Sequence, residues 1–296
     1  MHGQSAFDIH GYIQARFADQ EGMSEGIQIP RARVIVSGDP VSKLSYVFQA
    51  DLHNSPYLLD AAITWTFSRE WAITAGQFKI PFGTESLIAD NLDIPITRAR
   101  AVNSLSPGRD TGVQARDVGL QLAGALYRDR NPVLEYAAGV FRGQTVVEAP
   151  RAHYPAVAAR LMVRPTPVVS VGGDWYSSFS SAGGMDKRSE EAEGSVHPGP
   201  MLFRAEQIWA RDGGLDRRGG YALAACRLSL HWEPLARADW LTTNTHKANA
   251  TSIAYIAGLN FYWRKHVKVG ANAGAQHDQG PKRLGGVFLI ETTLGF

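Results

Sequence analysis

Apolar and polar residues alternate one by one along most of this 296-residue chain, and this period of two restricts its fold more than any other feature. In the last segment Phe288, Ile290, Thr292, Leu294 and Phe296 share one face, and the residues between them share the other. Successive side chains of a strand point to opposite faces. An amphipathic strand that ends on an aromatic final residue is typical of an outer-membrane barrel, in which every strand edge has to be paired.

The same alternation recurs from a first strand, predicted over residues 7–19, to the end of the chain. Its segments have about ten residues, which suits a tilted membrane crossing, whereas soluble strands usually have about five or six. No run of about 18 apolar residues occurs, so transmembrane helices are excluded. All seven tryptophans fall at or near predicted strand ends. Interfacial girdles place aromatic rings there, although a general preference of Trp for strands is the alternative.

Short turns alternate with longer polar loops, as the periplasmic turns and external loops of such barrels do. Fifteen strands can be counted along the sequence, and an odd number would leave the C-terminus on the wrong side of the membrane. A polar strand hidden within residues 179–200 would restore the parity. We therefore predict an all-β fold, a transmembrane antiparallel up-and-down β-barrel of 16 strands, with 14 as the alternative count. Residues 1–296 form a single barrel domain in this interpretation.

Charge and cysteine content restrict the partners only weakly. The formal net charge of +2 predicts no nucleic-acid partner, and the single Cys226 excludes an intramolecular disulfide. The first residues lack a basic segment followed by an apolar core. If the chain is an outer-membrane barrel, we expect that an export signal has already been removed from this sequence and that Met1 is an added start.

An ordered set of short motifs in the first half of the chain carries a family resemblance. It comprises residues 75–83 (AGQFKIPFG), residues 85–87 (ESL), Arg98, Arg100 and residues 107–113 (PGRDTGV). The preceding IPRAR at residues 29–33 and later short motifs, such as GVFRG at 139–143 and GLNFY at 258–262, follow in the expected order. This set resembles the phosphate-selective porin O and P family over nearly the whole chain.

The resemblance implies a 16-stranded barrel in the outer membrane of a Gram-negative-type bacterium, surrounded by outer-membrane lipid and usually assembled as a homotrimer. Small anionic solutes would pass a constriction formed by a long infolded loop, which corresponds to residues 83–108. Apolar residues of this loop, Leu87, Ile88, Leu92, Ile94 and Ile96, predict that it packs inside the barrel. The loop also carries Glu85, Asp90 and Asp93 and no lysine before Arg98, so the resemblance supports porin architecture better than phosphate specificity.

If the apolar faces contact lipid, the basic residues in the opposite phase point into the lumen. They are Arg16, Arg31, Arg33, Lys43, Lys79, Arg116, Arg160, Arg204, Arg227, Arg237 and Lys268. Carboxylates in that phase are fewer: Asp8, Asp51, Asp60, Asp117, Asp174, Glu206, Asp239 and Glu291. An excess of cations would raise the local anion concentration. Alternatively, the arginines pair with carboxylates and stiffen the wall without selecting a solute.

The pore-lining, anion-contacting residues that we predict flank or belong to the constricting loop. They are Arg31, Arg33, Lys79, Arg98, Arg100, Arg109 and Arg116. The predicted function is that of an outer-membrane porin for passive diffusion of small solutes, with a moderate anion preference and phosphate among the candidates. The main alternative is a structural or plugged barrel that serves as the membrane component of a larger complex. An outer-membrane barrel enzyme and a soluble β-sandwich are weaker alternatives.

Other chemistry has little support in the sequence. No nucleophile elbow, phosphate-binding loop or zinc-protease helix occurs, and the nine histidines lack metal-ligand spacing. We interpret the acidic run at residues 190–193 (EEAE) as a solvated loop rather than a calcium site. We therefore expect no enzymatic activity, no cofactor and no metal.

Overall fold

The computed structural model describes residues 7–20, 25–143, 155–179, 185–264, 266–277 and 284–296. These residues form sixteen strands and two short helices. The first five strands are β1 (Asp8–Gln20), β2 (Gly26–Val41), β3 (Leu44–Asp51), β4 (Leu58–Thr66) and β5 (Ala72–Lys79), followed by α1 (Thr84–Leu87) and α2 (Arg100–Leu105). The chain continues with β6 (Arg116–Arg128), β7 (Asn131–Phe141), β8 (Ala156–Thr166), β9 (Val169–Phe179), β10 (Met185–Val196) and β11 (Met201–Asp212). It ends with β12 (Leu215–Cys226), β13 (Trp232–Thr242), β14 (Thr251–Arg264), β15 (Val267–His277) and β16 (Leu284–Gly295).

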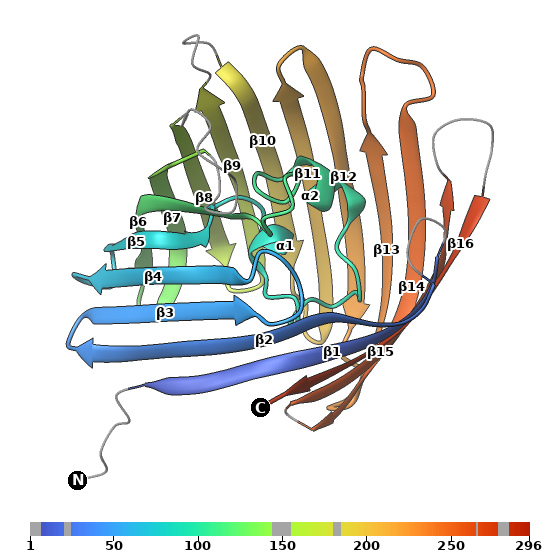
Figure 1. Ribbon diagram of the computed structural model, residues 1–296, viewed down its shortest axis with the longest axis horizontal. Helices are drawn as coiled ribbons and strands as arrows, with labels where there is room; N and C mark the ends of the chain where they lie inside the picture. Colours follow the sequence, from blue (N-terminus) through green and yellow to red (C-terminus); the bar gives the residue numbers. More distant parts are fainter. Residues whose placement is uncertain (1–6, 21–24, 144–154, 180–184, 265, 278–283) are drawn as a thin grey trace.

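The strands form one closed antiparallel barrel in which each strand pairs with its neighbours in sequence and β1 pairs with β16 (Figure 1). The prediction of 16 strands is confirmed, and the alternative count of 14 is wrong. The strand that parity required within residues 179–200 is β10. Among the described residues no helix has both the length and the apolar character needed to cross a membrane.

The barrel closes where the last residue meets the first strand. The Gly11 amide donates to the Phe296 carbonyl, and the Phe296 amide donates to the Gly11 carbonyl, both at 3.0 Å. The Phe296 ring lies over Gly11, where an added Cβ would be 2.6 Å from the ring and 2.3 Å from the Arg33 carbonyl oxygen. Glycine at position 11 therefore allows the terminal ring to cover the seam.

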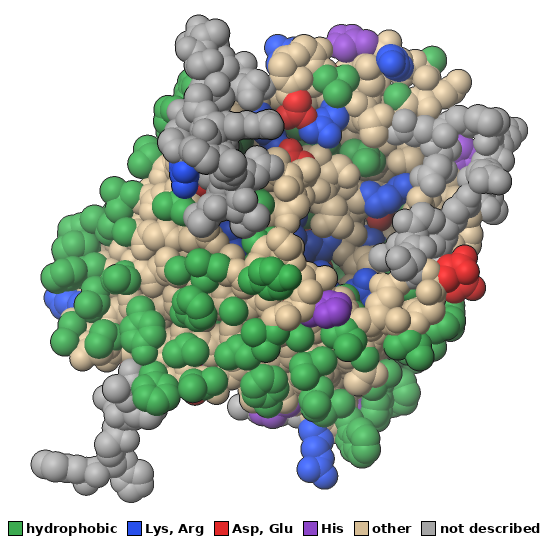
Figure 2. Space-filling view, in the orientation of Figure 1, with side chains coloured by type: hydrophobic (Ala, Val, Ile, Leu, Met, Phe, Trp, Pro, Cys, Tyr) green, Lys and Arg blue, Asp and Glu red, His purple; other side chains and the backbone are tan. Residues whose placement is uncertain are grey.

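Large apolar side chains cover the outer wall, as Figure 2 shows on one face of the molecule. Tryptophans lie toward both ends of the strands. Trp65, Trp71, Trp232 and Trp263 lie toward the short-turn end, whereas Trp175, Trp209 and Trp240 lie toward the opposite end. This arrangement matches the two aromatic girdles of a barrel in a bilayer, because an indole ring is apolar on its face and polar at its N–H.

The segment between β5 and β6 lies inside the ring of strands, where Figure 1 shows both helices. Its α2 buries Val102 and Leu105 in an apolar cluster that also contains Ile208 and Tyr221 of the wall. Ile96 packs in a second cluster with Leu289. Burial of these side chains opposes release of the segment into the lumen.

We expect substitution of Gly11 by Ala to weaken barrel closure, since the new methyl group would overlap the Arg33 carbonyl and the Phe296 ring. Overpacking of this kind costs about 1–3 kcal/mol. Urea unfolding in detergent micelles, followed by the heat-modifiable shift on gels, measures the loss. Gly286→Ala on β16 is the control, because nothing lies within 4 Å of its added Cβ. Equal stability of the two variants would contradict the prediction.

Candidate functional site

Three wall carboxylates hold the first residues of the lumenal segment. The Gly83 amide donates to Asp174 of β9 at 2.6 Å, and the Glu85 amide donates to Glu206 of β11 at 2.7 Å. Between them, the Thr84 amide donates to Glu193 of β10 at 3.1 Å. The first amides of a helix have no partner within the helix. Adjacent strands therefore supply the acceptors that the first residues of α1 lack.

Cationic side chains hold the other end of α1. The Lys79 Nζ donates to the Leu87 and Ile88 carbonyls at 2.9 and 3.0 Å. Arg109 donates to the Ser86 hydroxyl at 2.8 Å and to the Ser86 carbonyl at 2.5 Å. The last carbonyls of a helix also lack intrahelical partners, and cations are favoured there. This one-turn helix is thus fixed between acidic and basic groups.

Asp90 is the centre of a buried arginine cluster that continues from this end of α1. Its carboxylate pairs with Arg33 at 2.5 Å, with Arg98 at 2.9 Å and with Arg31 at 3.2 Å. Burial alone would raise the pKa of Asp90, but the guanidinium groups of these three residues and of Arg109 together hold it well below its usual range. The Asp90 carboxylate therefore stays charged at neutral pH and ties the segment to β2.

Contacts of residues 83–115 reach most of the inner wall. Besides β2, β5 and β9–β11, the segment bonds to side chains of β1, β8, β13, β14 and β15. These bonds join Arg16 to the Ile96 carbonyl, Arg160 to Thr84, Arg237 to the Thr97 carbonyl, Asn260 to the Ile94 carbonyl and Asn272 to the Ile96 amide. A segment held on so many sides narrows the lumen along its whole path.

The structure brings most of the predicted site residues together around residues 84–93. Those in or next to this cluster are Arg31, Arg33, Lys79, Arg98, Arg109 and Arg116, the last paired across the strands with Lys79. Arg100 lies apart at the start of α2, where it pairs with Asp239 of β13 at 3.0 Å. Their contact with a permeating anion stays a prediction.

Most of these cationic side chains pair with carboxylates. Arg33 contacts Asp51 and Asp90, and Arg116 contacts Asp60 at 2.8 Å. Lys79 and Arg109 are different, because within the described part of the chain no carboxylate lies within ion-pair distance of either. Burial lowers the pKa of the Arg109 guanidinium, and the nearby Arg98 adds to this effect. Both cations instead hold loop carbonyls.

Two parts of the sequence-based charge assignment are wrong. Lys43 lies in the turn between β2 and β3 rather than on the inner face of a strand, and Arg227 lies just beyond the end of β12, where it pairs with Glu233 at 3.6 Å. The predicted shortage of lumenal carboxylates is also wrong. Glu191 and Glu193 are buried on the inner face of β10 rather than in a solvated loop. Their spacing of two residues was the available signal, and the polar character of this strand concealed it.

A cavity of about 480 Å³ lies inside the barrel between α1 and the connections that follow β8 and β10. Its charged lining residues are Arg160, Arg164 and Arg204, and His197 is also part of the lining. No carboxylate belongs to the lining among the described residues, although Glu135 pairs with Arg164 at 2.7 Å from outside it. The side chain of Arg164 is 35% exposed, more than that of Arg160 or Arg204.

A closed barrel of 16 strands, an apolar outer face and a lumenal segment between β5 and β6 define an outer-membrane porin fold. Solved porin structures share this fold. OmpF of Salmonella typhi in complex with daunomycin superposes with a TM-score of 0.74 at 9% identity, over 98% of this chain and 97% of OmpF. An anion-selective porin from Comamonas acidovorans gives 0.73 at 8% identity, over 99% of this chain and 100% of that porin. The OmpT loop L8 deletion mutant of Vibrio cholerae gives 0.72 at 11% identity, over 98% of this chain and 99% of the mutant.

The phosphate-selective porin O and P family matches residues 4–145, which confirms the predicted resemblance over that part of the chain. No curated protein matches the chain by sequence. Family and fold together place the chain in the outer membrane of a Gram-negative-type bacterium and indicate a channel rather than an enzyme.

We expect Asp90→Asn to destabilise the protein by about 3 kcal/mol, because it removes the one carboxylate that Arg31, Arg33 and Arg98 share in a buried place. The depressed pKa of Asp90 makes its contribution complete above about pH 5, and the contribution is lost as pH falls through the folded-state pKa. The stability difference between wild type and variant therefore stays constant from neutral pH to about pH 5 and closes in stronger acid.

Urea unfolding in micelles at several pH values measures this difference. Asp39→Asn, at an exposed position near the end of β2, is the control and leaves stability unchanged. An Asp90→Asn variant as stable as wild type at neutral pH would contradict the assignment of Asp90 as an anchor.

Proposed function

We propose that this protein is a porin through which small solutes diffuse passively, with a moderate preference for anions. The lumenal cavity carries the proposal, because Arg160, Arg164, Arg204 and His197 line it and no described carboxylate does. A lining with one sign of charge raises the local concentration of counter-ions and disfavours ions of the same sign. Lys79 and Arg109 add positive charge at the constricting segment, residues 83–108.

The preference is moderate because the arginines that line the cavity also pair with carboxylates outside the lining. Arg160 pairs with Asp174 and Glu193, Arg204 lies 3.4 Å from Asp93, and Arg164 pairs with Glu135. These pairs reduce the potential that a permeating ion meets. We therefore infer general anion preference, with phosphate as one of the solutes that pass, rather than a dedicated phosphate site. The proposal includes no catalytic activity.

A plugged or structural barrel is the second candidate. The observation that favours it is the reach of residues 83–115, which bond to side chains of most of the wall strands around the lumen. Such a barrel would serve as the membrane part of a larger outer-membrane complex. Single-channel conductance distinguishes the two candidates, because a plugged barrel conducts no ions.

We also propose that the protein assembles as a homotrimer in the membrane. The family resemblance supports this assembly, and a structure of OmpT from Vibrio cholerae is described as its trimer form. Trimerisation would place three lumens side by side. Conductance steps in groups of three would accompany it.

Planar-bilayer recordings across a tenfold KCl gradient test the function directly. Passage of chloride in preference to potassium makes the dilute compartment negative. We expect Arg164→Glu to lower the chloride-to-potassium permeability ratio severalfold. Replacement of a positive by a negative charge changes the energy of a monovalent ion at about 4 Å by about 2 kcal/mol in water, and salt reduces this value.

Arg128→Glu is the matched control, since Arg128 is exposed at the short-turn end of β6 and does not line the cavity. It leaves the permeability ratio unchanged. Preference for potassium in the wild type would refute the anion proposal, and lack of conductance would favour the plugged barrel.

A further inference from the structure

One buried carboxylate next to α1 has no role in anchoring the segment. Asp174, Glu193 and Glu206 each accept a backbone amide of residues 83–85, but Glu191 accepts none. Its side chain is buried, with the residue only 5% exposed, and neither carboxylate oxygen has a hydrogen-bond donor among the described residues. A buried charged group without a partner is strongly unfavourable, so another group has to compensate for it.

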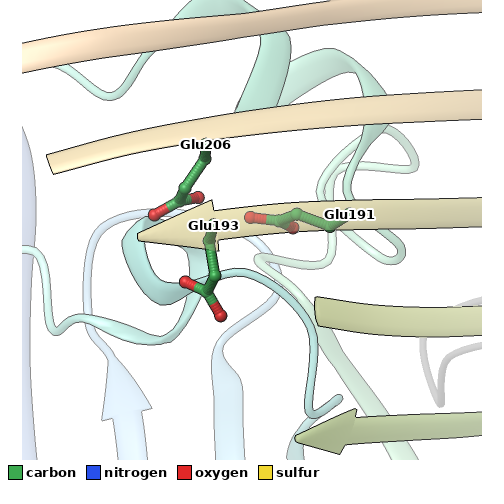
Figure 3. A group of neighbouring side chains, drawn as sticks. All are labelled: Glu191, Glu193 and Glu206. Atoms are coloured by element: carbon green, nitrogen blue, oxygen red, sulfur yellow. The ribbon is translucent and has the colours of Figure 1, made fainter. Parts of the chain in front are cut away.

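Glu191 points toward two of the anchoring carboxylates. Figure 3 shows the side chains of Glu191 and Glu193 from β10 and of Glu206 from β11 converging beside the lumenal segment. One oxygen from each of the three lies within 4.8 Å of the others. The second oxygen of Glu206, Oε2, also lacks a donor. Glycine at position 83 leaves the space open, because a Cβ there would be 2.9 Å from Glu191 Oε2.

Nearby arginines do not neutralise the cluster. Its carboxylates are those of Glu85, Asp174, Glu191, Glu193 and Glu206. Arg160 pairs with two of them, whereas Arg204 and Arg237 reach only Glu85 among the five, at 3.9 and 3.6 Å, and also contact Asp93 and Asp239 outside the cluster. When all five are ionised, these carboxylates outnumber the three guanidinium groups by two in a buried place. One divalent cation would balance this excess.

We propose that Glu191, Glu193 and Glu206 bind one calcium ion at the base of the lumenal segment. An all-oxygen ligand set suits a hard cation. Ca²⁺ accepts six to eight oxygen ligands in a flexible geometry, whereas Mg²⁺ demands a near-ideal octahedron. Three wall carboxylates that converge from two strands therefore suit Ca²⁺ better, and water completes the coordination.

The bound ion would fix the segment more firmly to the wall. Glu193 and Glu206 are both ligands in this proposal and acceptors for the amides of Thr84 and Glu85. Calcium therefore holds in place the same carboxylates that hold the start of α1. This inference does not depend on the anion preference of the channel.

Calcium titration of the full chain tests the proposal. The protein is refolded into detergent without lipopolysaccharide, which itself binds calcium, and is then freed of metal with a chelator. We expect isothermal titration with CaCl₂ to give one ion per chain for the wild type, with a higher unfolding temperature in calcium. Glu191→Gln loses both effects while it folds to the same heat-modifiable barrel.

Glu190→Gln is the matched control, because Glu190 is the preceding residue but has an exposed side chain that pairs with Arg188. It binds calcium as the wild type does. The wild type also gives a measurement that needs no variant. Terbium in place of calcium should show luminescence excited through Tyr221, whose hydroxyl donates to Glu206 at 2.7 Å, and excess calcium should abolish it.

Three results would overturn the proposal. One is a wild-type chain that binds no calcium and shows no terbium luminescence. The second is calcium binding that Glu191→Gln leaves intact. The third is a wild-type unfolding temperature that depends on pH but not on calcium, together with loss of this pH dependence in the Glu191→Gln variant. That result would mean that Glu191 and Glu206 share a proton instead of a metal ion.

Discussion

The structure depends on how the barrel wall binds a helix of a single turn. Alone, α1 has too few residues to be stable, since a helix this short has few internal hydrogen bonds. The wall supplies the missing partners: carboxylates of β9, β10 and β11 at the first amides, and Lys79 and Arg109 at the last carbonyls. This opposed placement of charge fixes where the segment enters the lumen. The apolar contacts of α2 and the arginine cluster around Asp90 hold the rest of the segment.

The same interaction explains why positive residues near the constriction do not by themselves make an anion site. Lys79 and Arg109 hold carbonyl groups, and Arg33 and Arg116 hold carboxylates, so most of their charge serves the attachment of the segment. The cavity next to α1 is where positive side chains have no described carboxylate beside them in the lining, and Arg164 and His197 belong to that lining. Our proposal of moderate anion preference rests on that cavity, and the proposed calcium site adjoins it at the start of α1, where Glu193 contacts both Arg160 and the Thr84 amide.

Much of the fold could be predicted from the sequence, because lipid on the outside and water on the inside impose a period of two on every strand. The closed barrel of 16 strands and the hidden strand β10 both followed from that constraint. The site was less predictable. Asp174, Glu193 and Glu206 act together only because β9, β10 and β11 are neighbours and face α1. The spacing of these residues in the sequence does not indicate that they meet. The sequence predicted a solvated position for Glu191 because its strand lacks large apolar residues.

Hydrogen exchange of the backbone amides of Gly83, Thr84 and Glu85 tests the central claim most directly. These amides are bonded to wall carboxylates at 2.6, 3.1 and 2.7 Å and lie inside the barrel. They should therefore exchange as slowly as those of the surrounding strands. The exposed residues Ala248 and Asn249, in the connection between β13 and β14, provide the fast reference. Exchange of residues 83–85 as fast as this reference would show that the wall does not hold the segment, and would contradict the account.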